Sequence, residues 1–226
     1  FRSPLLGLEA VFEHLRADHW FSLHGALSDG QQVVLPTGEL SALTNASGEY
    51  SFNDRFTMNG SILLKGMPVV HRGSRAVTSE ETDQAFSDLS KMADFPVVAT
   101  VVDGLITEIR SAVSGANPFL GAIEGFFSKD ERYRKIHEIG FGTNRMTSPL
   151  ADYNFFPNER YPGVHFGIGL GGYTQFHHDL VCTETDVLIE VENGEMIDVH
   201  RSLGLRGGTS RAGVRSRYER LAPYPE

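Results

Sequence analysis

The sequence predicts an α+β fold, in which a largely antiparallel β body forms a single domain with helices packed against it. Short runs rich in β-branched and aromatic residues alternate with Gly, Pro, Asn and Asp, as is typical of strands joined by turns. Two tight-turn signals, Asp103-Gly104 and Asn193-Gly194, each join two such runs. Three longer stretches carry helix signals. We expect one domain over residues 1–226, with its core in 31–199 and an Arg-rich tail over 200–226.

Composition narrows the class of protein. The chain has 226 residues, of which 40% are hydrophobic and 22% charged, as in ordinary globular proteins. Its net charge of −9 argues against nonspecific binding to nucleic acid. We see no membrane-spanning run and no signal peptide, and the single Cys182 excludes an internal disulfide. We therefore expect a cytoplasmic protein without a nucleic-acid or membrane partner; a homodimer is left open. The chain begins at Phe1 rather than Met, so an upstream segment is also left open.

The first segment, residues 3–20, predicts an amphipathic helix. Ser3 fits an N-cap and Pro4 the first helical position. The apolar residues at helical spacing are Leu5, Leu8, Val11, Phe12 and Leu15. Three histidines near its end, His14, His19 and His24, follow no ligand pattern, so we favour solvated side chains over a metal cluster.

The middle of the chain predicts strands, then helices. Antiparallel strands are expected within residues 31–45, 49–59 and 60–70. Thr78-Ser79-Glu80-Glu81 is a capping box that predicts a helix to about Ala93. Residues 96–102 and 105–111 flank Asp103-Gly104 as a hairpin, and Asn117-Pro118 opens a further helix.

The end of the chain predicts a second hairpin and then a solvated tail. Residues 186–199 flank Asn193-Gly194 as the two arms of the hairpin. The tail is rich in Gly and Ser, which favours a solvated end over an anion-binding segment. Its arginines are Arg201, Arg206, Arg211, Arg215, Arg217 and Arg220.

The stretch from Glu138 to Leu180 gathers histidine, carboxylate and glycine most densely. His177 and Asp179 are two residues apart, so on a strand both side chains point to one face. His165 lies in an alternating run that also predicts a strand, and neighbouring strands would bring it beside the pair. Two histidines and a carboxylate suffice for zinc or for a non-haem ferrous ion.

Four glycines in the same stretch, Gly167, Gly169, Gly171 and Gly172, have two readings of about equal weight. They either allow a ligand or the main chain to approach closely at a cleft wall, or form a glycine-rich bend. A phosphate loop is excluded because no strand, GxGxxG and helix occur in succession, and no internal repeat or nucleophile elbow is found.

Five motifs carry a resemblance to a known family. In order they are PTGEL, HEIGFGTN, NERYPGVHFGIG, the pair Gly171-Gly172, and HHDLV. Together they resemble the C-terminal domain of the aminopeptidase T family of metallo-aminopeptidases and, equally, the related dihydroxypyridine ring-cleaving dioxygenase. The resemblance covers roughly residues 31–199.

The resemblance implies a metal site. In the peptidases it implies a two-metal zinc or cobalt centre, whose residues here would be Glu39, Glu138, His165, His177 and Asp179. In the dioxygenase branch, His165, His177 and Asp179 would hold one ferrous ion. We therefore expect these residues to converge with Glu39 at the rim. Structural alternatives are an exposed strand-end role for Glu39, a core role for His165 and pairing of Glu138 with Arg134 or Lys135.

The sequence also departs from the family. Only eleven residues, Phe166 to Phe176, separate His165 from His177, which shortens one pocket wall. The N-terminal α/β domain that closes over the cleft in full-length relatives is not in this chain, so we expect an open half-cleft. An open site lacks the water exclusion on which catalysis usually depends.

The sequence also leads to expectations for two residues near the predicted ligands. Tyr173, beside Gly171 and Gly172, either donates a hydrogen bond to a bound oxyanion or packs as an aromatic side chain. His178 should point away from the metal, because it alternates with His177 and Asp179 on the expected strand.

Two classes of function follow. The favoured one is a peptide-binding accessory protein, similar to those of ribosomal-peptide pathways such as that for crocagin, in which a peptide adds to a sheet edge. It would keep a divalent zinc or iron ion, or none. The other is a metal-dependent enzyme, either a hydrolase with a metal-activated water or an iron-dependent ring-cleaving oxygenase. The missing half of the cleft favours binding.

Overall fold

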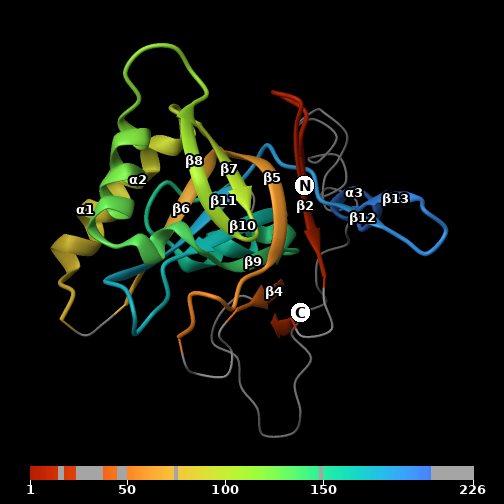
Figure 1. Cartoon of the computed structure of the whole chain (residues 1–226), viewed down its shortest axis with the longest axis horizontal. Helices are drawn as coiled ribbons and strands as arrows, with labels where there is room; N and C mark the ends of the chain where they lie inside the picture. Colours follow the sequence, from red (N-terminus) through yellow and green to blue (C-terminus); the bar gives the residue numbers. More distant parts are fainter. Residues whose placement is uncertain (15–17, 24–37, 45–49, 74–75, 148–149, 205–226) are drawn as a thin grey trace, which may run out of the picture.

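Two antiparallel sheets form the body of the molecule (Figure 1). The computed structural model describes residues 1–14, 18–23, 38–44, 50–73, 76–147 and 150–204. The first sheet has the strand order β1 (Arg2–Ser3), β2 (Leu8–Glu13), β5 (Thr57–Leu64), β7 (Val97–Val102) and β8 (Leu105–Ser111). The second has the order β3 (His19–Leu23), β4 (Glu39–Leu43), β9 (Ile136–Gly142), β10 (Gly163–Ile168), β11 (Phe176–Cys182) and β6 (Gly66–Arg72). The predicted α+β fold with an antiparallel body is confirmed.

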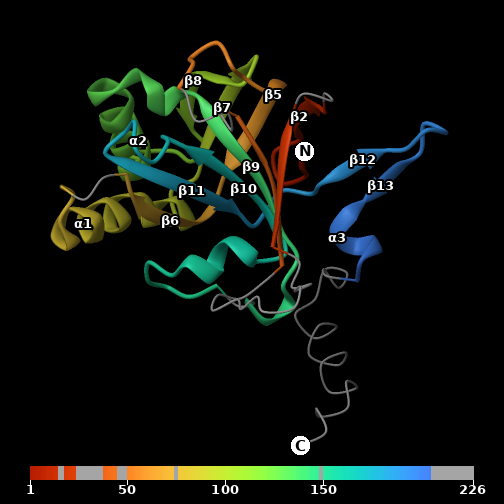
Figure 2. The same ribbon diagram turned by 90° about the horizontal axis from the view of Figure 1, so that it is seen from below.

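The core lies between the sheets. Met58 and Ile62 of the first sheet belong to the same buried cluster as Ile139, Phe166 and Leu180 of the second. The helices α1 (Ser79–Leu89) and α2 (Pro118–Lys129) contact each other, and α1 also contacts β6 (Figure 2). The remaining helical segments are η1 (Ser90–Ala93), η2 (Glu131–Arg134), η3 (Arg145–Thr147), η4 (Phe156–Arg160) and α3 (Val199–Ser202).

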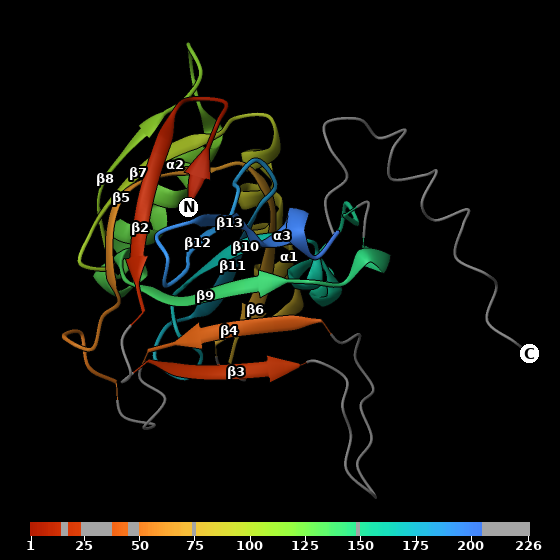
Figure 3. The same ribbon diagram turned by 90° about the vertical axis from the view of Figure 1, so that its right-hand side faces the viewer.

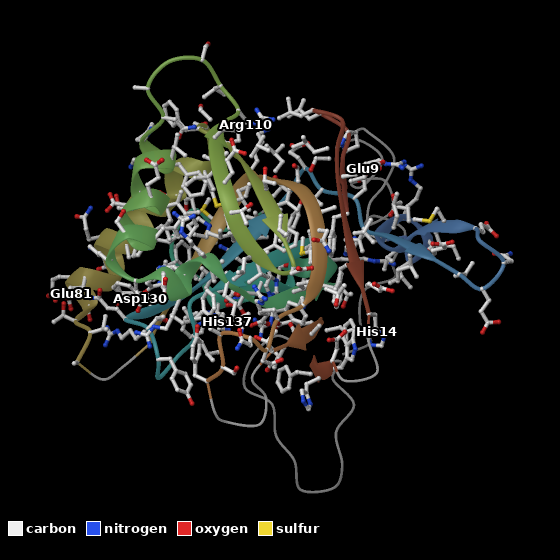
Figure 4. All side chains as sticks on the ribbon, in the orientation of Figure 1. Glu9, His14, Glu81, Arg110, Asp130 and His137 are labelled. Atoms are coloured by element: carbon white, nitrogen blue, oxygen red, sulfur yellow. The ribbon has the colours of Figure 1, made fainter. Side chains whose placement is uncertain are left out.

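Several elements predicted from local sequence signals are confirmed. Thr78 and Glu81 form the expected capping box at the start of α1, and Figure 4 shows Glu81 at the outside of the molecule. The Asn117 side chain caps α2 by accepting from the backbone N–H of Leu120. Asp103 and Gly104 join β7 to β8 with φ angles of 47° and 73°, which is the left-handed pair a two-residue hairpin turn requires.

The predicted helix over residues 3–20 is wrong. Ser3 pairs with Leu8 in the β1–β2 hairpin, and β2 then pairs with β5. Leu5 and Val11 are 60% and 68% exposed, so the helical spacing of apolar residues marks no buried face. Burial in β2 instead alternates around Ala10, as in a strand. Tertiary pairing with β5 outweighed the local helix signal.

The predicted strand boundary at Gly60 is also wrong. Gly60 lies inside β5, where it pairs with Ala10, and the chain passes to the second sheet only at Lys65 and Gly66. A Cβ at Gly66 would overlap the carbonyl oxygen of Val181 on β11. Glycine is needed there because the two backbones approach so closely.

A separate hairpin of β12 (Leu188–Glu190) and β13 (Met196–Asp198) confirms the one predicted around Asn193-Gly194. It projects from the two sheets in Figure 1, and in Figure 3 it faces the viewer in front of them. Of the tail arginines, Arg201 lies in α3 and the others lie outside the described residues. No helix in the described part of the chain is long and apolar enough to cross a membrane.

The second sheet faces the core on one side only. Its other face carries alternate residues of β4, β9, β10, β11 and β6, and η4 contacts β9, β11 and β6 on this side. Figure 2 shows this short helix, in teal, beneath the sheet. The candidate metal-binding residues Glu39, Glu138, His165, His177 and Asp179 lie on this outer face.

Candidate metal centre

The pairing of three central strands gathers the motif residues on one face. Glu138 of β9 lies opposite Gly167 of β10, which in turn lies opposite Asp179 of β11. His165 lies opposite Gly140, two residues along each strand and therefore on the same face. Side chains directly opposite in antiparallel strands share a face, so the expected juxtaposition of His165 with His177 and Asp179 is found.

Two glycines make room for this convergence. A Cβ at Gly140 would overlap the His165 ring, and one at Gly167 would lie 2.8 Å from His177 Cε1 and 3.0 Å from Asp179 Oδ1. The predicted close approach therefore holds at Gly167. At Gly171 nothing lies within 4 Å of an added Cβ, so this glycine is not needed for clearance.

The donor atoms stand at distances suited to a shared ion. His165 Nε2 lies 3.5 Å from Glu138 Oε1 and 3.9 Å from Asp179 Oδ1. His177 Nε2 lies 3.1 Å from Asp179 Oδ1 and 3.4 Å from Glu138 Oε2. Ligands bound at 2.0–2.3 Å from one ion are separated from each other by about 3–4 Å. Glu138 thus faces both imidazoles, one with each oxygen.

Two of these buried donor atoms have no hydrogen-bond partner among the described residues. His165 Nε2 and Asp179 Oδ1 are buried without a hydrogen-bond partner, and the two residues are 1% and 2% exposed. An unsatisfied buried polar atom costs about 1–3 kcal/mol, which a bound cation would offset. The His177 Nδ1 contacts the Gly169 carbonyl at 2.5 Å, so its Nε2 is directed at the cluster. The residues present therefore fit a divalent metal ion.

Glu39 joins the cluster from β4. Its Oε1 lies 3.6 Å from His165 Nε2, and its Oε2 pairs with the Arg160 guanidinium at 2.9 Å. The Ser41 hydroxyl donates to Oε1. Glu39 was expected at the rim, but it is buried, because Arg160 and the sheet enclose it.

Sequence reasoning missed three residues of the cluster. His71 of β6 lies opposite His177, and its Nε2 is 2.5 Å from Glu159 Oε1 and 3.1 Å from Asp179 Oδ2. Glu159 and the adjacent Arg160 come from η4 and pair with each other. The only signal for Glu159 was its place in the NERYPGVHFGIG motif; His71 had none, because β6 is remote in sequence from β11.

The charges of the cluster are strongly coupled. Burial lowers the pKa of His165, but the adjacent Glu138 and Asp179 carboxylates outweigh it and raise that pKa to about 9. Burial likewise lowers the pKa of His71, but the hydrogen bonds that its imidazole donates to Asp179 and Glu159 outweigh burial and raise that pKa to about 9. For Glu138, burial and Asp179 raise the pKa, but the adjacent His165 and His177 imidazoles prevail and lower it to about 2. Without a cation, imidazolium groups balance the carboxylates, so protons and metal ions compete.

The remaining residues singled out in the sequence lie away from the cluster. His178 points to the opposite face, as expected, and its buried ring packs against Phe126, Tyr133 and Phe176. The Tyr173 ring packs 5.3 Å from that of Tyr50. Within the described residues, the pocket over the cluster is not lined by Tyr173, Gly171 or Gly172, so their role toward a ligand stays a prediction.

A pocket of about 330 Å³ lies over the cluster. Its walls include Phe21 of β3 and Leu43 of β4 beside the carboxylates. The pocket therefore reaches from the cluster to the outermost strand of the second sheet.

An antiparallel two-sheet domain with a histidine and carboxylate cluster on an open face is the class that this fold and site define. The chain belongs to the family of crocagin biosynthetic proteins CgnE/B, whose model matches residues 26–190. None of the curated proteins compared with the chain matches it.

The chain is also similar to a solved structure, that of 2,5-dihydroxypyridine dioxygenase from Pseudomonas putida KT2440. The identity is 13% and the TM-score 0.36, and the match covers 64% of this chain and 38% of the dioxygenase chain. This chain thus spans less than half of that protein. No comparison supports the resemblance to aminopeptidase T.

Proposed function

We propose that this chain is a peptide-binding accessory protein of a crocagin-type ribosomal-peptide pathway, and that a peptide adds as a strand to the edge of β3 with which no described strand pairs. Membership of the crocagin biosynthetic family supports the pathway. The observation that carries the binding mode is the position of β3, which ends the second sheet and borders the pocket through Phe21.

The other edge of the same sheet is already occupied. The Asn154 side chain bonds both backbone groups of Val70 on β6, accepting from its N–H and donating to its carbonyl, each at 2.9 Å. A side-chain amide in this position imitates a neighbouring strand and blocks pairing there. On β3, no described strand pairs with the side opposite β4.

The side chains of β3 suit a bound peptide. Phe21 is 48% exposed beside the pocket, and Trp20, on the opposite face of the strand, is 42% exposed. In strand addition the main chain supplies affinity and alternate side chains supply selectivity. Exposed aromatic side chains at such an edge supply apolar contact for the peptide.

In this proposal the cluster holds a divalent zinc or ferrous ion that is not required for peptide binding. A fluorescein-labelled crocagin precursor peptide, titrated with the protein in the presence of a chelator, should bind as tightly as without it. The matched ligands are two versions of the same peptide, each N-methylated at one of the two sets of alternate residues. The version whose methyl groups face β3 cannot donate main-chain hydrogen bonds to it and should bind at least about tenfold more weakly. Unchanged affinity for both methylated peptides would argue against strand addition.

Two proline substitutions test whether the peptide pairs with the edge of β3. Successive N–H groups of an edge strand point alternately toward its neighbour and away from it, so of Trp20→Pro and Phe21→Pro only one should disturb the pairing with β4. The other should stay as stable as the wild type in urea and lose the peptide. If that stable variant binds the peptide normally, β3 is not the docking strand.

A metal-dependent enzyme is the alternative, and the complete donor set of Glu39, Glu138, His165, His177 and Asp179 favours it. A bound divalent ion would supply Lewis-acid or, for iron, oxygen-dependent chemistry. Short peptides and dihydroxylated aromatic rings incubated with protein and zinc or ferrous iron should remain unchanged under our proposal. Chelator-sensitive turnover that is lost in the His177→Ala, Asp179→Ala variant would establish the enzyme instead.

A further inference from the structure

The two bridging carboxylates of the cluster repeat one arrangement. Glu138 presents Oε1 to His165 and Oε2 to His177. Asp179 presents Oδ1 to His177, at 3.1 Å, and Oδ2 to His71, also at 3.1 Å. A carboxylate that faces a different imidazole with each oxygen is placed to bridge two adjacent positions. Asp179 therefore extends the site toward His71, which lies outside the sequence motifs.

The outer end of this series has its own three donors. His71 Nε2, Glu159 Oε1 and Asp179 Oδ2 form a group whose donor atoms all lie within 4.8 Å of one another. Glu159 and Asp179 are buried, whereas the side chain of His71 is 28% exposed. Burial thus fixes the two carboxylates, and the partly exposed His71 lies on the solvent side of the group.

Surrounding contacts hold these donors in place. The Phe156 ring lies 4.7 Å from the His71 ring, and Phe156 belongs to the same segment, η4, as Glu159. The second oxygen of Glu159 pairs with Arg160, so Oε1 is the one directed at His71. Groups that contact metal ligands raise the affinity for metal by holding the ligands in a fixed orientation.

We propose that His71, Glu159 and Asp179 form a further divalent-cation position, which shares Asp179 with the position at Glu138 and His177. One imidazole and two carboxylates suit zinc, manganese or ferrous iron. Because the outer position shares Asp179 with the inner one, an ion already bound at Glu138 and His177 opposes a second positive charge there. The outer position is therefore the weaker one and fills after the positions around Glu138.

Zinc titration of the metal-free full chain by calorimetry tests this position. The wild type should show a tight phase followed by a weaker one. His71→Ala should remove the weaker phase and keep the tight one. Glu159→Gln, which keeps the shape of the side chain, should weaken the same phase by more than about tenfold, the least that loss of even an outer partner costs.

The control is His14→Ala, which removes an exposed imidazole at the edge of the molecule and should leave both phases unchanged (Figure 4). Far-ultraviolet circular dichroism would verify that each variant is folded. If both folded variants keep the wild-type isotherm, or if both lose the tight phase with the weak one, the outer position does not exist. The titration contains no peptide, so its outcome is independent of the peptide-binding proposal.

Discussion

Gly140 shows how a residue without a side chain shapes the cluster. The His165 ring occupies the space that a Cβ at Gly140 would fill, and His165 supplies one of the unsatisfied buried donor atoms. No periodicity or ligand spacing in the sequence points to this glycine, because its partner lies on another strand. The expected clearance was found at Gly167. The requirement for glycine at position 140 follows only from the register of β9 and β10, which places the His165 ring opposite it.

Gly140→Ala should therefore displace His165 and weaken zinc binding by about tenfold or more. Equilibrium dialysis followed by elemental analysis measures the affinity. The matched control is Gly125→Ala in α2, where an added Cβ meets nothing within 4 Å. That change should leave zinc affinity unaltered and raise the free energy of unfolding by about 0.5–1 kcal/mol. Unaltered zinc affinity in Gly140→Ala would show that His165 is not a ligand.

Lys135 is a buried charge outside the cluster. Its Nζ donates to the Ser51 carbonyl at 2.7 Å, and burial lowers its pKa to about 8, below the 10.5 of an exposed lysine. Between pH 8 and 10.5 the unfolded chain binds this proton and the folded chain does not. The free energy of unfolding should therefore rise with pH in this window.

Urea unfolding of the wild type and of Lys135→Met, at pH 7.5 and pH 10, measures this dependence. The wild type should gain about 1–3 kcal/mol relative to the variant as the pH rises. The comparison cancels other groups that titrate in the same range. If the two proteins respond to pH in parallel, the Lys135 ammonium is not disfavoured by burial.

At the scale of the element, the sequence predicted what local chemistry decides. The capping box of α1, the Asn117 cap of α2 and the Asp103-Gly104 hairpin each depend on residues within a few positions of one another. The prediction of a helix over residues 3–20 was wrong for the opposite reason, because β2 is stabilised by pairing with β5, about fifty residues away. The change of sheet at Gly66 was missed likewise, because it depends on the approach of β11.

The protected edge of β6 leads to a prediction about this element. Asn154→Ala leaves the N–H and carbonyl of Val70 without their side-chain partners, so the free energy of unfolding should fall by about 1–3 kcal/mol. Urea denaturation measures the loss. Gln84→Ala, which removes an amide from the exposed face of α1, should change it by no more than about 0.5 kcal/mol. Equal stability of the two variants would mean that Asn154 does not close the edge.

At the scale of the whole molecule, the strand order explains how much of the site was accessible from sequence. His165, His177 and Asp179 were found because β10 and β11 follow one another in the chain and pair. His71 and Glu159 reach the same face from β6 and η4, which only the order of the second sheet and the placing of η4 bring there. The same order leaves β3 at the end of the sheet, next to the pocket.

Amide hydrogen exchange in the presence of the crocagin precursor peptide tests the central claim most directly. The sample is the His177→Ala, Asp179→Ala variant in chelator, so that metal chemistry is removed. Strand addition predicts that alternate amides in residues 19–23 exchange at least about tenfold more slowly when the peptide is bound, while residues 66–72 are unchanged. Bound peptide without any slowing in residues 19–23 would contradict the account.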